Sequence, residues 1–222
     1  MAAATPFFNS SAESARAAGE RLLAELQRSD ADISAGKLLN LMGTNVDYNV
    51  TSDKGETPLL LAAQKGFFIA ASRMVDYGAD VNKPDQFGFT PFMMAASGND
   101  RALVDALLSK NADINARSAA GDTAFTLTGG QGHNAMLKYL MVKGAVFTDS
   151  DGAATLTAAS SRGYMDVVKT IADYFDAREN AARQAIADAE KARRDTIISI
   201  ADTFRHGPQS KVAAPRTARF RH

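Results

Sequence analysis

A short motif that recurs every 33 residues is the feature that most limits how this chain can fold. Its threonines are Thr57, Thr90 and Thr123, in the segments GETPLLLAAQKG (55–66), GFTPFMMAASGN (88–99) and GDTAFTLTGGQG (121–132). A second motif keeps the same step, as GADVN (78–82), NADIN (111–115) and GAVFT (144–148). Two motifs that recur in phase indicate structural repeats that stack on one another.

Less regular copies lie on both sides of these three. A fourth copy follows two residues early, from Gly152 to Gly163. Upstream, segment 43–47 is interpreted as the end of a degenerate first copy, with a loop to Gly55 that is two residues longer. One repeat cannot bury its apolar face alone, so neighbouring repeats supply the core and the end units act as caps.

The start of each copy predicts a helix. Thr57 and Thr90 suit the N-cap position, because the proline that follows each of them lacks only an N–H group that a first helical turn leaves unpaired. Apolar residues at helical spacing predict a second helix in each copy and two capping helices near 12–28 and 35–42. The third copy has Gly129 and Gly130 inside its first helix, where each glycine costs about 1 kcal/mol relative to alanine. The third repeat is therefore a candidate hinge, with full compensation by its neighbours as the alternative. We expect the double alanine variant to be more stable by about 1–2 kcal/mol.

These residues resemble the ankyrin-repeat family, whose signature has this period, a T-P-L-x-x-A core and a GADVN-like loop. The resemblance covers residues 17–175. It implies an all-α solenoid of helix-turn-helix repeats with hairpin tips, to which helix propensity adds a long C-terminal helix. The predicted parts are a flexible N-terminus (1–11), an ankyrin-repeat domain (12–175) made of a degenerate cap repeat (12–52) and four repeats (53–85, 86–118, 119–149, 150–175), a helix (176–206) and a basic disordered tail (207–222).

The C-terminal helix carries an apolar stripe at its far end. Residues 176–206 contain no proline or glycine and are rich in alanine and charged residues, which favours a helix. Ile197, Ala201 and Phe204 fall on one face of it. We expect this stripe to pack back on the repeats, to self-associate or to meet a partner. The alternative is a frayed helix followed by a solubilising tail.

No constellation of residues indicates catalysis. The chain has no cysteine and three histidines, and it lacks the H-E-x-x-H, G-x-S-x-G and G-x-x-x-x-G-K-[ST] motifs. His133 occupies a position where the family pattern usually has a structural histidine. Asp149 and Asp151 lack the ligand series of a calcium loop and are interpreted as a solvated turn. We expect no enzyme activity, no cofactor, no metal site and no small-molecule substrate.

Charge and hydropathy limit the possible partners and the cellular location of the protein. The formal net charge is zero, and the five basic residues from Arg205 onward are too few to favour nucleic acid. No apolar window is long enough to span a bilayer, and the N-terminus does not resemble a secretory signal. The expectation is a cytoplasmic protein without a membrane span, with export by a non-Sec route as the alternative.

Partners of ankyrin-repeat proteins usually dock on the concave surface, which consists of the loop tips and the first helices of the repeats. Phe87 and Phe89 stand out there, because exposed aromatic side chains supply interface hot spots. The alternative is that they pack on neighbouring tips. Carried over position by position, the candidate partner-binding residues are Lys54, Glu56, Gln64, Lys65, Gln86, Phe87, Phe89, Asp122, Gln131 and Arg162.

The leading functional hypothesis is a protein-protein interaction module, an adaptor or inhibitor that binds one specific protein. The alternative is a bacterial secreted effector that binds a host protein, because the segment RTARFR (216–221) resembles basic C-terminal export signals. We expect a monomer, with self-association through the C-terminal helix as the other possibility. The identity of the partner stays open.

Overall fold

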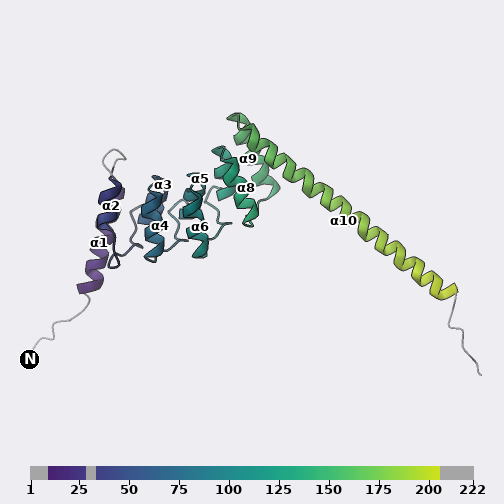
Figure 1. Cartoon of the computed structure of the whole chain (residues 1–222), viewed down its shortest axis with the longest axis horizontal. Coiled ribbons are helices and arrows are strands. Elements are labelled where there is room, and N and C mark those ends of the chain that lie inside the picture. Colours follow the sequence, from purple (N-terminus) through teal and green to yellow (C-terminus); the bar gives the residue numbers. More distant parts are fainter. Residues whose placement is uncertain (1–9, 29–33, 206–222) are drawn as a thin grey trace, which may run out of the picture. The chain divides into compact units, whose positions relative to one another are not determined.

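The computed structural model of the chain describes residues 10–28 and 34–205. Within these ranges the backbone forms ten α-helices and no β-strand, which confirms the predicted all-α repeat fold (Figure 1). The chain divides into two units, Met1–Ala172 and Asp173–His222. The helices are α1 (Ser10–Leu26), α2 (Ala35–Leu41), α3 (Pro58–Gln64), α4 (Phe68–Asp76), α5 (Pro91–Ser97), α6 (Arg101–Ser109), α7 (Ala124–Gly130), α8 (Asn134–Val142), α9 (Asp149–Ser161) and α10 (Met165–Arg205).

The first helices of the three regular repeats begin where the threonines predict. The Oγ1 atoms of Thr57, Thr90 and Thr123 each accept a hydrogen bond from the backbone N–H three residues further on, at 3.2, 3.3 and 3.2 Å. In α3 and α5 a proline stands in the first turn, where it needs no donor. In α7 the backbone N–H of Thr123 also donates to the hydroxyl of Thr126 at 2.9 Å, which completes a capping box.

Corresponding helices of successive repeats pack against one another. The first helices form a row in which α3 contacts α5, α5 contacts α7 and α7 contacts α9, while α4 contacts α6 beside it. Leu59, Phe92 and Phe125 occupy the same position in successive repeats and are at most 1% exposed. Burial of such a side chain stabilises the fold by about 1.5–3 kcal/mol. One continuous cluster of buried side chains runs from Leu22 in α1 to Leu140 in α8.

Helices α1 and α2 close the N-terminal end of the stack, as predicted for a cap. Leu22, Leu26 and Leu38 are fully buried, and α1 packs against α2 and α3. Glu25 is also buried there, and its Oε2 accepts a hydrogen bond from Lys37 Nζ at 2.7 Å. That bond, opposed by burial and assisted by Arg28, lowers the pKa of the Glu25 carboxyl. The acid is thus held as a carboxylate inside the cap.

A ladder of asparagine side chains joins successive repeats. Each asparagine accepts a hydrogen bond at Oδ1 from a backbone N–H group 31 residues further on, in the next repeat. The three bonds run from Asp80 N to Asn49 (2.8 Å), from Asp113 N to Asn82 (2.8 Å) and from Val146 N to Asn115 (2.7 Å). The ladder ties the repeats to one another at their loops in the same way three times.

The ladder corrects the predicted alignment of the first copy. Asn49 does in that copy what Asn82 does 33 residues later, so the segment that corresponds to 78–82 is 45–49 and not 43–47. The loop that leads to Gly55 is consequently not two residues longer. The misalignment arose because Gly43 looks like the loop glycine Gly78, whereas Asn45 occupies the corresponding position.

The last repeat departs from the others, and here the interpretation of a solvated turn was wrong. Thr148 caps α9, because its hydroxyl accepts a hydrogen bond from Asp151 N. In turn, Asp151 Oδ2 accepts a hydrogen bond from Thr148 N at 2.8 Å. Asp149 and Asp151 therefore lie in the first turn of a helix, and Asp151 is only 6% exposed. The helix begins directly after the loop that contains Phe147, so this repeat has no projecting tip of its own.

The unit Asp173–His222 is described as far as Arg205, where α10 ends. Residues 176–205 are helical, as predicted, and the side chains of 176–202 are exposed. At the other end α1 begins at Ser10, inside the segment predicted to be flexible. The predicted basic tail (207–222) lies outside the described residues.

Candidate functional site

Main-chain hydrogen bonds link the tips of successive repeats. The backbone O of Lys54 accepts from Gln86 N at 2.9 Å, and that of Phe87 accepts from Ala119 N at 2.7 Å. The contact is close, because a Cβ on Gly88 would lie 2.9 Å from Ala119 N, and Gly88 has a φ of +82°. Only glycine fits there without strain. The tips thus present their side chains from a linked main chain.

Each tip is also closed by a side chain at its base. The hydroxyl of Ser52 donates to Glu56 Oε2 at 3.0 Å, and that of Ser118 donates to Asp122 Oδ2 at 3.2 Å. In the repeat between them, Asp85 accepts from two backbone N–H groups of its own tip at 2.9 Å. Glu56 and Asp122 therefore stabilise the tips, whatever else they contact.

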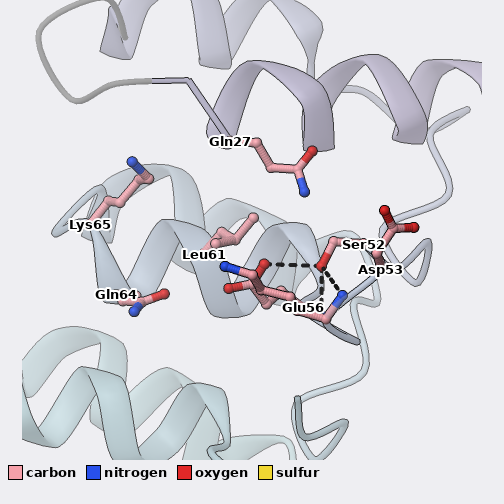
Figure 2. Close-up of a pocket in the computed structure, with 8 residues that line it drawn as sticks. Gln27, Ser52, Asp53, Glu56, Leu61, Gln64 and Lys65 are labelled. Atoms are coloured by element: carbon pink, nitrogen blue, oxygen red, sulfur yellow. Dashed lines mark hydrogen bonds between the residues drawn. The ribbon is translucent and has the colours of Figure 1, made fainter. Parts of the chain in front are cut away.

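A cavity of about 660 Å³ opens between the end of α1, the first tip and α3 (Figure 2). In Figure 2 Gln27 extends from the end of α1 toward the tip and Leu61, while Gln64 and Lys65 lie at the far end of α3. The ammonium group of Lys65 donates to the backbone O of Arg28 at 3.0 Å. Four predicted residues line this cavity; its full lining is Gln27, Ser52, Asp53, Lys54, Glu56, Leu61, Gln64 and Lys65.

A second hollow of about 410 Å³ adjoins the first. It lies between the ends of α3 and α5 and extends to Ser97 and Gly98. Gln64 and Lys65 line both hollows, so the two share a wall at the end of α3. Lysine, glutamine and carboxylate groups dominate the larger one, whose only purely apolar side chain is that of Leu61.

The structure separates the two predicted phenylalanines. Phe87 is 54% exposed at its tip, whereas Phe89 is partly buried and packs against the core of the repeats. For Phe87 the binding interpretation stays a prediction. For Phe89 binding also stays a prediction, although its ring packs against the core, whereas the alternative expected it to pack on a neighbouring tip.

The remaining predicted residues lie at tips or at the ends of first helices. Gln86 is exposed beside Phe87, and Gln131 is exposed at the C-cap of α7. Arg162, at the C-cap of α9, donates from Nη1 to the backbone O of Gly130. Arg162 therefore joins two repeats, and the surface brings Lys54, Gln64 and Lys65 together more closely than the rest.

One half-buried ion pair joins Arg117, just before the third tip, to the last repeat. Arg117 forms two hydrogen bonds to the carboxylate of Asp151, with Nη2 to Oδ2 at 2.6 Å and Nη1 to Oδ1 at 2.9 Å. The Arg117 guanidinium, opposed by burial and helped by Thr148, lowers the pKa of Asp151 to about 2. The same bond raises the pKa of Arg117.

Sequence reasoning missed three features of this region. It missed the asparagine ladder, although the recurrence of asparagine at positions 82 and 115 was visible. It missed Gln27 as a lining residue, because the candidate residues were carried over only from the tips and first helices of the repeats, whereas Gln27 directly follows α1. It also missed the pairing of Arg117 with Asp151, which are 34 residues apart and show no shared pattern.

Comparison with known proteins decides the family. A family model described as ankyrin repeats (3 copies) matches residues 28–118 and 99–183. The chain belongs to the ankyrin-repeat family. A comparison with curated proteins found no match.

Ankyrin repeats indicate a protein-protein interaction module, and the membership confirms the resemblance seen in the sequence. Among the described residues no helix combines the length and the apolar character that crossing a membrane requires. Nor does that part of the chain gather three or more histidine, aspartate or glutamate side chains in a geometry that could hold a metal ion.

Proposed function

We propose that this ankyrin-repeat protein acts as an adaptor or inhibitor that binds one specific protein through its concave surface. The observation that carries the proposal is the cavity of about 660 Å³ lined by Lys54, Gln64 and Lys65. It lies where the family binds its partners, and the linked tips hold one of its walls in place.

The chemistry of the lining favours a polar segment of a protein over a small molecule. Small-molecule sites are mostly apolar with a few polar groups, whereas this cavity is lined mainly by charged and amide side chains. Both signs of charge are present, in Asp53 and Glu56 and in Lys54 and Lys65. Such a lining suits a partner surface that offers both carboxylates and cationic or amide groups.

Phe87 supplies the apolar part of the proposed contact. It is more than half exposed at the second tip, and its main chain is bonded to the next tip. A partner that covers the tips buries this ring, and truncation of a hot spot of this kind typically costs about 2 kcal/mol or more of binding free energy.

The test compares Phe87→Ala with Ile69→Ala, a large exposed side chain on α4, outside the tips and the first helices. Protein captured by the wild-type chain from extracts of its native cells is identified by mass spectrometry, and its affinity for both variants is measured. We expect Phe87→Ala to weaken binding about 30-fold and Ile69→Ala to leave it unchanged. Equal affinities for wild type and Phe87→Ala would contradict the proposed contact.

The secreted-effector alternative rests on the basic segment at 216–221, which lies outside the described residues. An effector would use the same concave surface on a host protein. Deletion of 207–222, followed by an export assay, separates the two: loss of export with binding intact supports the effector.

A further inference from the structure

The unit Asp173–His222 presents apolar side chains along a helix. Ile186, Ile197, Ile198 and Ile200 are 61%, 58%, 53% and 52% exposed. Between Asp173 and Arg205 the helix carries six basic and seven acidic residues. A nearly neutral helix is not drawn to nucleic acid or to an anionic membrane. We therefore expect a protein surface to cover its apolar side chains.

Three of these four isoleucines belong to a regular pattern. Steps of three and four residues connect six positions of α10, which is the spacing of one face of a coiled coil. We call these six residues the seam: Arg183, Ile186, Glu190, Arg193, Ile197 and Ile200. Ile198 lies outside the seam, because it points away from the face that these positions share.

The order of charges in the seam is antisymmetric about its centre. When two copies lie antiparallel in register, Glu190 faces Arg193 of the second copy, Ile186 faces its Ile197, and Arg183 faces its Ile200. Every central layer then joins opposite charges or two isoleucines. When two copies lie parallel, Glu190 faces Glu190, Arg193 faces Arg193 and Arg183 faces Arg183, so three layers join like charges. Charge complementarity therefore selects the antiparallel arrangement.

In each outer layer, Arg183 of one copy lies against Ile200 of the other, and this pairing is not unfavourable. Arg183 donates from Nη2 to Glu179 Oε1 at 2.6 Å within its own helix, so its charge keeps a partner while its aliphatic stem can cover an isoleucine. Beside the seam stand Ala182, Ala187, Ala189 and Ala201. Such small side chains let two helices approach closely.

We propose that α10 pairs with α10 of a second copy of this chain, antiparallel and through the seam, so that the protein is a dimer. This goes beyond the proposed function, because it uses neither the tips nor the first helices of the repeats. If the chain does not dimerise, the proposed binding of a protein partner through the repeats is unaffected.

Neighbouring isoleucines provide the first test. The molar mass of the full chain is measured by sedimentation equilibrium over a range of concentrations, for wild type, Ile197→Asp and Ile198→Asp. We expect wild type and Ile198→Asp to approach twice 23.6 kDa. Ile197→Asp should raise the dissociation constant at least about 30-fold. A wild-type chain that stays monomeric at every concentration overturns the proposal, as does equal weakening by both variants.

Charge reversal tests the facing of Glu190 and Arg193. Glu190→Arg alone and Arg193→Glu alone each place like charges in both central layers of an antiparallel dimer, so both should dissociate more readily. An equimolar mixture of the two variants restores opposite charges in both layers and should regain dimers. A mixture that dimerises no better than either variant alone overturns the antiparallel arrangement.

Cross-linking between introduced cysteines tests the orientation of the two helices. The chain has no cysteine of its own, so only the introduced thiols react. Ile186→Cys and Ile197→Cys chains are treated with a short bismaleimide, alone and mixed, with Ala192→Cys as the control outside the seam. Only the mixture should cross-link, because equal positions of an antiparallel pair lie about 16 Å apart along the axis. Efficient cross-linking of Ile186→Cys with itself, at wild-type helicity, would show a parallel pair and overturn the proposal.

Discussion

Two adjacent glycines in α7 meet very different surroundings. A Cβ on Gly129 would lie 2.1 Å from Thr155 Cγ2, whereas the nearest atoms to a Cβ on Gly130 are 3.8 Å away. This geometry reverses the expectation for Gly129, where alanine should destabilise the fold. The third repeat uses that glycine to let α9 approach α7, a contact that the sequence of α7 alone does not reveal.

The two glycines should respond in opposite directions when they are replaced one at a time. Gly130→Ala removes freedom from the unfolded chain without a clash, so it should raise the free energy of unfolding by about 0.5–1 kcal/mol. Gly129→Ala overpacks the α7–α9 contact and should lower it by about 1–3 kcal/mol. Urea unfolding of both variants checks this. A Gly129→Ala chain as stable as wild type would contradict the close approach.

The ion pair between Arg117 and Asp151 makes the stability of the fold depend on pH. Because the pKa of Asp151 is lowered from 3.8 to about 2 in the folded chain, protonation favours the unfolded chain between these values. The pair's contribution is complete above pH about 4 and is lost as the pH falls toward 2. With allowance for solvent at Arg117, that contribution is about 1–2 kcal/mol.

Asp151→Asn should therefore be less stable than wild type at pH 6, and the difference should shrink as the pH approaches 2. Unfolding free energies at several pH values measure it. Glu20→Gln serves as control, because its pair with Arg16 is exposed on both sides and contributes little. A difference between wild type and Asp151→Asn that does not change with pH would contradict the assignment.

At the scale of elements, the repeats depend on one another through the asparagine ladder as well as through the core. Each rung satisfies a backbone N–H of the next repeat with a side chain of the previous one. A rung therefore fixes the spacing of two loops, in contrast to the core contacts, which fix the spacing of helices.

Asn82→Ala removes one rung and leaves the N–H of Asp113 without its partner. We expect a loss of about 1 kcal/mol in unfolding free energy, with faster amide hydrogen exchange at Asp113. Asn45→Ala is the matched control, since the structure shows no hydrogen bond from that side chain to another described residue. Equal exchange at Asp113 in wild type and Asn82→Ala would contradict the ladder.

Element starts could be predicted wherever a local signal determines them. Thr57 and Thr90 with their prolines gave the starts of α3 and α5, because a cap acts within three residues. The start of α9 was missed, although Thr148 and Asp151 form a capping box, because the expected tip took precedence over it. The alignment of the first copy failed for a different reason: only the bond to Asp80 distinguishes Asn49 from its neighbours.

At the scale of the whole chain, the period of 33 was enough to predict the family and the repeat stack. The surface was harder to predict, because carrying over positions from a family does not say which side chains converge. Lys54, Gln64 and Lys65 do converge on one cavity, while Glu56, Phe89 and Arg162 are engaged in contacts of the fold. The bond of Arg162 to Gly130 depends on a neighbouring repeat, which a single motif does not describe.

The most direct test of the account compares two faces of the repeat stack. Lys54→Ala with Gln64→Ala alters the cavity, and Arg73→Ala with Lys138→Ala alters exposed positions on the second helices α4 and α8. The measurement is the affinity of the captured partner for each double variant, at matched thermal stability. We expect at least a 10-fold loss of affinity, about 1.4 kcal/mol, for the cavity variant and no change for the other. A partner that ignores the cavity variant and is lost with the second-helix variant would contradict the account.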